Sequence, residues 1–347
     1  MPTTQVQEVI RRLEAEDPLG CGAAPAGVRW RARRLEGRRY SSIFVLEPAA
    51  GSDTVRARIG SRQLVLKVYR AAQAARRQKE FDDLSRVHAA LGGAQPAGVV
   101  RPVACYADLG ALVTVRARGS PLVVLMRAAC RRGGEPAALG QAAALCAAAG
   151  AWLHGFQAAG SEACRGQRPR DLGSPAGFLQ YLDERLRLLC VARPGIELEL
   201  RSQLMARAAA VLHSLSPGSL DAVTWSHSDF GPHNILVDGE RLTVLDFDLA
   251  PQHPAFDATY FVESLSHVRG PLVDAASVRR LERAFLAGYG DAPGEMLLAL
   301  FRLRHLVCSY LSESRRDGLA RLAGWPGLVG MRARLRAFLL AGASRAA

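Results

Sequence analysis

The segment 224–250, TWSHSDFGPHNILVDGERLTVLDFDLA, constrains the fold more than any other part of this 347-residue chain. It contains two short apolar runs, 235–237 and 242–245, separated by the dipeptide Asp238-Gly239. Asp-Gly between two apolar runs is a strong signal for a tight hairpin turn. The polar residues at both ends of these runs belong to types that are disfavoured inside strands. We therefore expect a short hairpin whose open end carries a cluster of polar side chains.

Three of these polar residues are candidates for chemistry. The hairpin brings Asn234, just before its first strand, close to Asp246, just after its second strand, and Asp229 lies on the loop that enters the same end. Carboxylate and amide oxygens suit Mg²⁺ bound to a nucleotide, and a further Asp can accept a proton from a hydroxyl nucleophile. This division of labour is that of phosphoryl transfer, in which the protein mainly positions the reactants and neutralises charge.

The basic residues contain a second signal. Lys and Arg together number 45, but Lys occurs only at Lys67 and Lys79, so 45 − 2 = 43 are Arg. Lys67 lies inside a β-branched, apolar run, 64–69, which predicts a strand with one charge set into it. A compact ammonium can meet phosphate oxygens as a point charge, whereas Arg presents a planar fork. The alternative is a lysine on the solvent face of an edge strand.

The chain before Gly119 favours a small sheet with one helix. Apolar runs and turn residues predict strands, and apolar positions spaced by three and four predict a helix. The predicted strands are 42–46, 63–69, 99–103 and 111–115, and the predicted helix is 71–91.

Beyond Gly119 the composition shifts toward Ala and Leu, and helical patterns dominate. The predicted helices are 135–158, 175–191 and 197–215, with more helices from 261 to 347. We predict an α+β fold with a small N-terminal antiparallel-sheet lobe carrying one main helix, residues 1–115, and a larger, mostly helical C-terminal lobe, residues 116–347.

Glycine-rich phosphate loops are missing from the sequence. There is no G-x-x-x-x-G-K-[ST] motif, and the glycines near the start do not have G-x-G-x-x-G spacing. A turn that ends in Ser41 and Ser42 does precede the run 43–46. Its backbone N–H groups are candidates to lie over phosphates.

The run HSDFGPHN followed by VLDFD resembles the aminoglycoside phosphotransferase/choline kinase-like family, which is related to the protein kinases. The shared pattern is His-x-Asp with an Asn five residues after the Asp. The resemblance extends over roughly residues 30–266. It implies a bilobal protein-kinase-like fold and a Mg²⁺-dependent enzyme that moves the γ-phosphate of ATP or GTP to a hydroxyl group of a small molecule.

The resemblance also implies roles for individual residues of the catalytic segment. Asp229 would orient and deprotonate the acceptor hydroxyl, while Asn234 and Asp246 would hold Mg²⁺. Asp248 stands where protein kinases have Gly; it is a further candidate metal ligand, and its role is open.

On the nucleotide side, Lys67 would contact the α- and β-phosphates and Glu80 would hold Lys67, although Asp82 and Asp83 lie close to Glu80 in sequence. Ser41 and Ser42 are the candidates in the turn over the phosphates.

The same resemblance places supporting residues around the catalytic segment. The helix containing Trp152 would pack behind the loop, and Asp257 would buttress it. His227 is expected to have a structural role, in which its side chain forms hydrogen bonds with the loop backbone.

The acceptor is predicted from charge. Residues 268–347 contain 13 Arg and six acidic residues, which disfavours a polycationic acceptor such as an aminoglycoside. A neutral or anionic, sugar-like hydroxyl compound fits better. Its pocket is expected to involve Asp183, Glu184 or Arg185, or residues near Tyr260 and Glu263.

Composition disfavours several other classes. The net charge of +13 is spread along the chain without a dense basic block, so nucleic-acid binding is not the expected purpose. The seven cysteines are scattered, which predicts neither a zinc site nor a disulfide framework. The N-terminus lacks the pattern of a secretory signal and no apolar run approaches about 20 residues, so we expect a cytoplasmic protein without membrane insertion.

Three alternatives remain open. The first is a catalytically silent kinase-like binding module, although such a module would usually have lost one of the residues Lys67, Asp229, Asn234 and Asp246. The second is an aminoglycoside- or choline-type kinase. The third is a protein kinase, which is disfavoured because no A-P-E motif or long activation loop follows Asp246. The sequence makes no prediction about the oligomeric state.

Overall fold

A computed structural model describes residues 4–19, 29–37, 41–48, 63–70, 75–91, 98–169, 173–192, 195–268, 273–290, 294–315 and 318–340. The chain divides into two compact units: Met1–Pro121 with His233–Leu249, and Leu122–Pro232 with Ala250–Ala347. The predicted lobes divide the chain once, at residue 115, whereas the first unit also includes the hairpin segment. Each unit is described here by itself.

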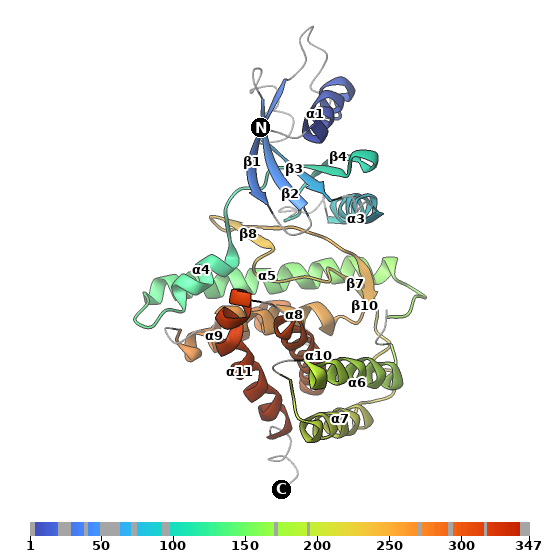
Figure 1. The fold of residues 1–347 in the computed structure, drawn as a ribbon, viewed down its shortest axis with the longest axis vertical. Coiled ribbons are helices and arrows are strands. Elements are labelled where there is room, and N and C mark those ends of the chain that lie inside the picture. The colour runs from blue at the N-terminus through green and yellow to red at the C-terminus, as the bar shows by residue number, and fades with distance from the viewer. Residues whose placement is uncertain are drawn as a thin grey trace. The chain divides into compact units, whose positions relative to one another are not determined.

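The first unit contains a five-stranded antiparallel sheet with the order β1-β2-β3-β5-β4 (Figure 1). The strands are β1 (Trp30–Gly37), β2 (Ser41–Pro48), β3 (Leu64–Tyr69), β4 (Pro102–Tyr106) and β5 (Ala111–Val115). The predictions for β2, β3 and β5 are confirmed. β4 begins three residues later than predicted, and Val99 forms only an isolated bridge to Val244.

Lys67 lies on the central strand of this sheet, opposite Ile43 of β2 and Leu112 of β5. The alternative of a lysine on an edge strand is therefore wrong. Leu64, Leu66 and Val68 are buried, while the residues between them are only partly buried. This alternation gives the sheet one fully covered face and places Lys67 on the other.

Two helices accompany the sheet. α1 (Thr4–Glu16) packs its residues Val6, Val9, Ile10 and Leu13 into the buried cluster on the sheet. Their spacing of three and four is that of an amphipathic helix. α3 (Ala75–Leu91) contacts β4 and the short 3₁₀ turn η2 (Ala107–Leu109). The predicted helix is confirmed from Ala75 onward, while residues 71–74 lie outside the described part.

The predicted hairpin is present in the first unit. β8 (Ile235–Asp238) pairs with β9 (Arg241–Val244), and β6 (Ser120–Pro121) pairs with the other edge of β8. Gly239 in the turn has φ 62°, a left-handed conformation that Gly adopts readily. Leu245 N–H donates to the carbonyl of Asn234 at 2.9 Å, so the two ends of the hairpin are adjacent as predicted.

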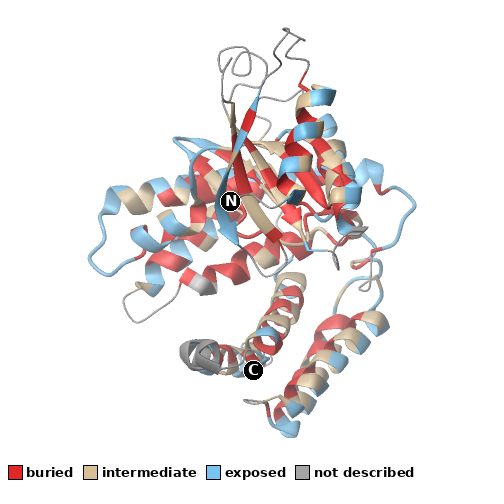
Figure 2. Ribbon diagram, turned by 45° about the horizontal axis from the view of Figure 1, so that its top comes forward, coloured by how far each residue is buried: buried red, intermediate tan, exposed pale blue. Residues whose placement is uncertain are grey.

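The second unit is mostly helical. Its elements are α4 (Leu122–Ala129), α5 (Pro136–Ala163), α6 (Pro175–Val191), α7 (Leu198–His213), α8 (Ala255–Ser264), η3 (Leu265–Val268), α9 (Ala275–Tyr289), α10 (Glu295–Ser314), α11 (Gly318–Leu340) and the paired strands β7 (Thr224–Ser226) and β10 (Ala250–Gln252). Buried and exposed residues alternate along its helices, as amphipathic packing requires (Figure 2). The predicted α6 is confirmed residue for residue, and α4 was not predicted.

α5 is long and apolar enough to span a membrane by length and composition. In the second unit it packs against α9, β7 and α4. The contact with α9 is close at two glycines, because a Cβ on Gly150 would lie 2.2 Å from the carbonyl oxygen of Phe285 and one on Gly288 would lie 2.0 Å from that of Ala147. Larger residues at these positions would force the two helices apart.

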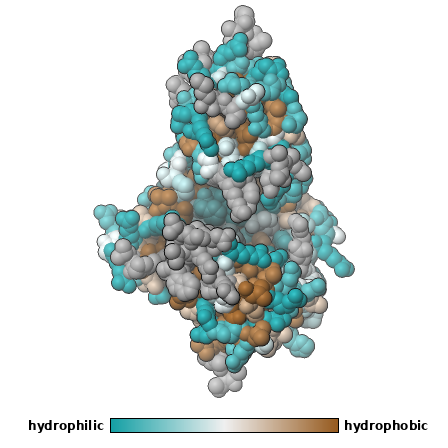
Figure 3. Space-filling model, in the orientation of Figure 1, coloured by the Kyte–Doolittle hydropathy of each residue, from teal (hydrophilic) through white to brown (hydrophobic). Residues whose placement is uncertain are grey.

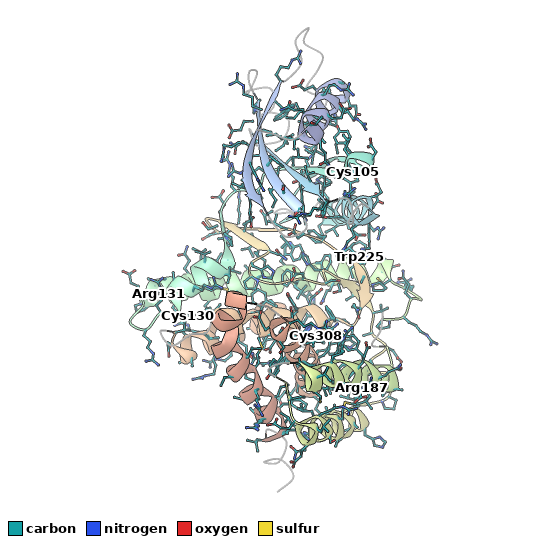
Figure 4. All side chains as sticks on the ribbon, in the orientation of Figure 1. Cys105, Cys130, Arg131, Arg187, Trp225 and Cys308 are labelled. Atoms are coloured by element: carbon teal, nitrogen blue, oxygen red, sulfur yellow. The ribbon has the colours of Figure 1, made fainter. Side chains whose placement is uncertain are left out.

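The hydropathy of the surface and the positions of the cysteines do not indicate a further functional site in the described residues. Hydrophilic residues make up much of the coloured surface in Figure 3, and hydrophobic side chains form small groups between them. Cys105, Cys130 and Cys308 lie on separate parts of the fold (Figure 4), and all six cysteines that the structure describes are free thiols. Cys21 lies outside the described residues.

Candidate active site

The centre of the candidate site in the first unit is the ammonium group of Lys67. Its Nζ lies 2.9 Å from Glu80 Oε1 and 3.0 Å from Asp246 Oδ1. Burial by itself lowers the pKa of Lys67, but the two carboxylates outweigh it and raise that pKa above its ordinary value. Lys67 therefore stays charged. Its ammonium group lies between Glu80 on a helix and Asp246 at the end of the hairpin.

The three acidic residues of α3 have different partners. Glu80 pairs with Lys67, and burial raises the pKa of Glu80 while Lys67 opposes this shift. Asp83 pairs with Lys79, and Asp82 accepts a hydrogen bond from Gln78. The structure thus distinguishes Glu80 from its neighbours, which the sequence alone left open.

A cavity of about 330 Å³ lies beside this ion pair. Its polar lining residues are Lys67, Glu80, Asn234 and Asp246, together with Glu36, Thr114, Arg116 and His233. Its apolar walls are Ile43, Val65, Leu84, Val100, Leu112, Val115, Leu236, Leu245 and Phe247. A mostly apolar cavity with a few convergent polar groups is typical of a small-molecule site.

The other predicted cofactor residues lie elsewhere. Asp248 does not line this cavity, nor do Ser41 and Ser42. Ser41 is buried opposite Tyr69, and Ser42 lines a different cavity. Residues 38–40 of the predicted phosphate-covering turn lie outside the described residues.

Asp246 has φ 59°, which is uncommon for a residue other than Gly. Such backbone strain persists only where the surroundings hold it, and it concentrates at functional sites. Contacts made by the next residues of the chain, Asp248 and Leu249, keep this backbone conformation in place.

Four residues, which we call the Lys79 cluster, fix the chain just after Asp246: Lys79, Asp83, Asp248 and Leu249. Lys79 Nζ lies 2.5 Å from Asp83 Oδ2, 2.7 Å from Asp248 Oδ1 and 2.9 Å from the carbonyl oxygen of Leu249. Asp83 Oδ2 also accepts from Leu249 N–H at 2.9 Å. Both lysines of the chain therefore contact the segment 246–249. The sequence signal that could have indicated this cluster is Lys79 itself, the second Lys of an Arg-rich chain, which lies four residues before Asp83.

We expect Lys79→Met to lower the free energy of unfolding by about 1 kcal/mol, because Lys79 is half-exposed and its ion pairs are screened by water. Urea denaturation measures this change. The control is Arg86→Met on the same helix, which is more exposed and reaches Asp83 of the cluster only at 3.8 Å; it should change stability by less than about 0.5 kcal/mol. Equal effects of the two substitutions would contradict a specific role for the Lys79 cluster.

The second unit holds the loop that carries Asp229. Asp257 is fully buried, and its carboxylate accepts from Ser226 Oγ at 2.9 Å, His227 N–H at 2.7 Å and Ser228 N–H at 3.1 Å. Burial raises the pKa of Asp257 to about 7, and these three donors oppose the shift. The prediction that Asp257 buttresses the loop is confirmed.

Two further contacts hold the same loop. His227 Nδ1 accepts from Asp229 N–H at 3.3 Å, which confirms the structural role expected for this buried histidine. The ring of Trp152 on α5 stacks on Phe230, with centroids 5.5 Å apart and an interplanar angle of 5°. The helix containing Trp152 packs against the loop as predicted.

Asp229 itself is contacted by Tyr260 of α8, whose hydroxyl donates to Asp229 Oδ1. Burial and the neighbouring carboxylate of Asp229 raise the pKa of Tyr260 well above its ordinary value, so the hydroxyl keeps its proton. Sequence reasoning placed Tyr260 near the acceptor; the structure places it on the candidate base.

The other residues proposed for acceptor binding lie in varied surroundings. Asp183 is paired with Arg201 at 2.6 Å. Glu263 is buried, forms an ion pair with Arg334, and borders a second-unit cavity of about 490 Å³. The guanidinium of Arg185 lies 5.0 Å from the ring centroid of Tyr181.

A lysine held by a helix glutamate and by the aspartate after a hairpin is the nucleotide-side arrangement of kinase-like folds. Comparison with known proteins agrees with this class. The model of the phosphotransferase enzyme family matches residues 45–297, and the chain belongs to that family. A search of curated proteins found no match.

Several solved structures that resemble this chain are named as small-molecule kinases. They include a candidate aminoglycoside phosphotransferase from Ralstonia eutropha JMP134 (14% identity, covering 97% of this chain and 98% of that chain, TM-score 0.63). Choline kinase from Cryptosporidium parvum Iowa II is 10% identical (96% and 94%, TM-score 0.56). Glucosamine kinase with glucosamine, ADP and inorganic phosphate is 20% identical (98% and 98%, TM-score 0.51). These likenesses confirm the predicted fold class, and with the family they identify a small-molecule kinase.

Proposed function

We propose that this kinase transfers the γ-phosphate of ATP or GTP to a hydroxyl group of a neutral or anionic, sugar-like molecule in the cytoplasm. The observation that carries the proposal is the position of Lys67, whose ammonium lies between Glu80 and Asp246 at the edge of a 330 Å³ cavity. Lys67 would contact the α- and β-phosphates. The apolar walls of the cavity would hold the base, and the glucosamine kinase with a similar fold binds ADP.

The oxygen donors near Lys67 fit a magnesium ion. Among the described residues, no group of three or more His, Cys, Asp or Glu side chains is placed to hold a metal. Mg²⁺ on a nucleotide needs only one or two protein oxygens, because phosphates and water supply the rest. Asn234 and Asp246 would hold it, and it would neutralise charge on the phosphates.

Asp248 stays a predicted third ligand. Its carboxylate already contacts Lys79, and Arg76 at 3.4 Å. If Asp248 holds metal, Asp248→Ala will weaken nucleotide binding as strongly as Asp246→Ala.

Asp229 is the proposed general base for the acceptor hydroxyl. Asp257 and His227 fix its loop, and Tyr260 orients its carboxylate. The silent-module alternative is disfavoured because the described residues retain both Asp229 with its supports and the Lys67 pair.

We expect Tyr260→Phe to move the acidic limb of the pH–rate profile to higher pH, because the hydrogen bond from this hydroxyl favours the charged form of the Asp229 carboxylate. The pH dependence of kcat/KM measures the shift. Tyr310→Phe removes another second-unit hydroxyl, one that contacts only the carbonyl of Gly195 among the described residues, and should leave the profile unchanged. If Tyr260→Phe left the pH–rate profile unchanged, Tyr260 would not influence the protonation of the general base.

Uncompensated guanidinium groups support a neutral or anionic acceptor. Arg185 and Arg304 both lie 5.0 Å from the ring centroid of Tyr181, and neither forms an ion pair with a carboxylate in the described residues. Arg304 also contacts His305, whose ring meets the edge of Tyr260 at 5.3 Å. Guanidinium groups without a carboxylate partner, one of them linked to Tyr260 through His305, favour an acceptor that carries negative charge.

The proposal is tested by calorimetry with Mg-ATP and Mg-GTP on the wild type and Lys67→Ala. Binding that is lost in the variant supports the nucleotide site. Phosphate transfer is then screened with sugars, sugar acids, sugar phosphates and aminoglycosides. Failure of both nucleotides to bind would favour the silent module, and efficient transfer only to aminoglycosides would overturn the proposed acceptor class.

A further inference from the structure

The first unit contains another cavity, of about 510 Å³. It shares no lining residue with the cavity of about 330 Å³ beside Lys67, which we call the nucleotide cavity after its proposed role. Ser42, Phe44 and Val68 line it, whereas the alternate residues Ile43 and Lys67 line the nucleotide cavity. Since side chains alternate between the faces of a sheet, Ser42, Phe44 and Val68 belong to the face opposite Ile43 and Lys67, whereas Tyr69 belongs to the face of Lys67. The remaining lining comes from α1, the end of β3, the first turn of α3 and residues 107–110.

A buried arginine lines this cavity without a counter-charge. Arg77 is only 2% exposed, and in the part of the chain that the structure describes it makes one hydrogen bond, from Nη1 to the carbonyl oxygen of Ala107 at 3.1 Å. Its Nε is buried and has no partner among those residues. The nearest acidic lining residue, Asp108, is paired with Arg12 at 2.7 Å. A buried guanidinium without an anion is unfavourable, and proteins normally pair such groups.

Tyr69 is a second lining residue with an unpartnered polar atom. Its hydroxyl is buried and lacks a hydrogen-bond partner within the described ranges. Its ring centroid lies 5.6 Å from Arg77 Cζ, and its N–H donates to the carbonyl of Gly110 at 2.9 Å. Gly110 has φ 64°, and a Cβ there would lie 2.7 Å from Arg77 Cζ, so glycine is what lets the guanidinium rest on the backbone.

We propose that this cavity binds a small molecule through an oxyanion group, a phosphate or a carboxylate, held by the guanidinium of Arg77 and the hydroxyl of Tyr69. The guanidinium fork matches such a group with two parallel hydrogen bonds. The cavity volume lies within the range usual for small-molecule sites.

The site is positioned to act on the nucleotide cavity. The Tyr69 ring centroid is 5.0 Å from Lys67 Nζ, and Arg77 lies one helical turn before Glu80 on α3. An anion that fixes Tyr69 and Arg77 would restrict both elements that carry the Lys67–Glu80 pair. We expect it to tighten nucleotide binding, and the nucleotide to tighten anion binding by the same factor. This coupling rests on the proposed function, but anion binding itself does not.

Binding is tested by calorimetry with inorganic phosphate and, separately, malonate, on nucleotide-free protein. We expect at least one of them to bind the wild type, with affinity at least tenfold weaker in Arg77→Gln and at least threefold weaker in Tyr69→Phe. Arg86→Gln, which removes the same charge from an exposed position of α3, and Lys67→Ala should both stay within threefold of the wild type. No binding of either anion would overturn the proposal. So would binding that survives Arg77→Gln and is lost in Lys67→Ala, which would assign the anion to the nucleotide cavity.

Thermal unfolding of Arg77→Met provides a second readout in case Arg77→Gln fails to fold. We expect this variant to be at least as stable as the wild type in anion-free buffer, and to lose the increase in Tm that the binding anion gives the wild type. An equal increase in Arg77→Met would overturn the site. The affinity for Mg-ATP with and without the anion then tests the coupling, for which at least a threefold change is expected; no change would overturn the coupling alone.

Discussion

Asp246→Ala is expected to weaken the binding of Mg-nucleotide by at least about 100-fold, because it removes both a proposed metal ligand and one of the two carboxylates on Lys67. Binding of ATP and GTP by calorimetry at saturating Mg²⁺ measures the loss. The same titration without Mg²⁺ should show no comparable loss, because the metal ligand then plays no part and Lys67, still held by Glu80, remains to meet the phosphates.

The matched control is Asp82→Ala, which removes an exposed carboxylate of the same unit that accepts a hydrogen bond from Gln78. Its nucleotide affinity should lie within twofold of the wild type. Asp246→Ala with unchanged Mg-dependent affinity would refute the metal assignment, whatever its effect on turnover.

Asp229→Asn is expected to lower kcat by about 10² to 10⁴, the range over which a positioned general base contributes. Nucleotide affinity should change by less than twofold, because Asp229 belongs to the second unit and does not line the nucleotide cavity. Single-turnover phosphate transfer to the acceptor found in the screen, together with nucleotide calorimetry, separates the two quantities.

Asp221→Asn is the control for this substitution, because Asp221 is an exposed carboxylate before β7 in the same unit. Full turnover by Asp229→Asn would show that another group takes the proton. A parallel loss of turnover and of nucleotide affinity would instead indicate that the substitution disturbs the loop rather than the proton transfer.

The sequence predicted the parts of the site that are encoded locally. Asp238-Gly239 fixes the hairpin turn, so the proximity of Asn234 and Asp246 followed from spacing alone. Lys67 was found because a Lys inside an apolar strand is unusual in a chain whose basic residues are almost all Arg. The resemblance to a known family added the loop supports at Asp257 and Trp152, and the structure shows both contacts.

What the sequence did not predict depends on contacts between distant residues. Lys79 and Asp248 are 169 positions apart, and no local pattern joins them. From the sequence, Arg77 resembles an ordinary surface residue in the first turn of a polar helix. Only the fold shows that it is buried against Gly110. α1 was missed although its apolar residues have helical spacing, because the charged residues between them gave the segment a polar character.

The division of the chain bears on how the protein is synthesised. The first unit is not contiguous: its sheet is made from the N-terminal residues, but β8, β9 and Asp246 are translated only after the first half of the second unit. While the N-terminal sheet emerges from the ribosome, Lys67 can already reach Glu80 but has no Asp246 to contact. At an elongation rate of about 5–20 residues per second, the interval between Glu80 and Asp246 lasts on the order of 10 to 30 s. The Lys67–Asp246 ion pair therefore forms later in synthesis than the Lys67–Glu80 pair. A fragment ending at Pro121 would lack the Lys67–Asp246 pair altogether.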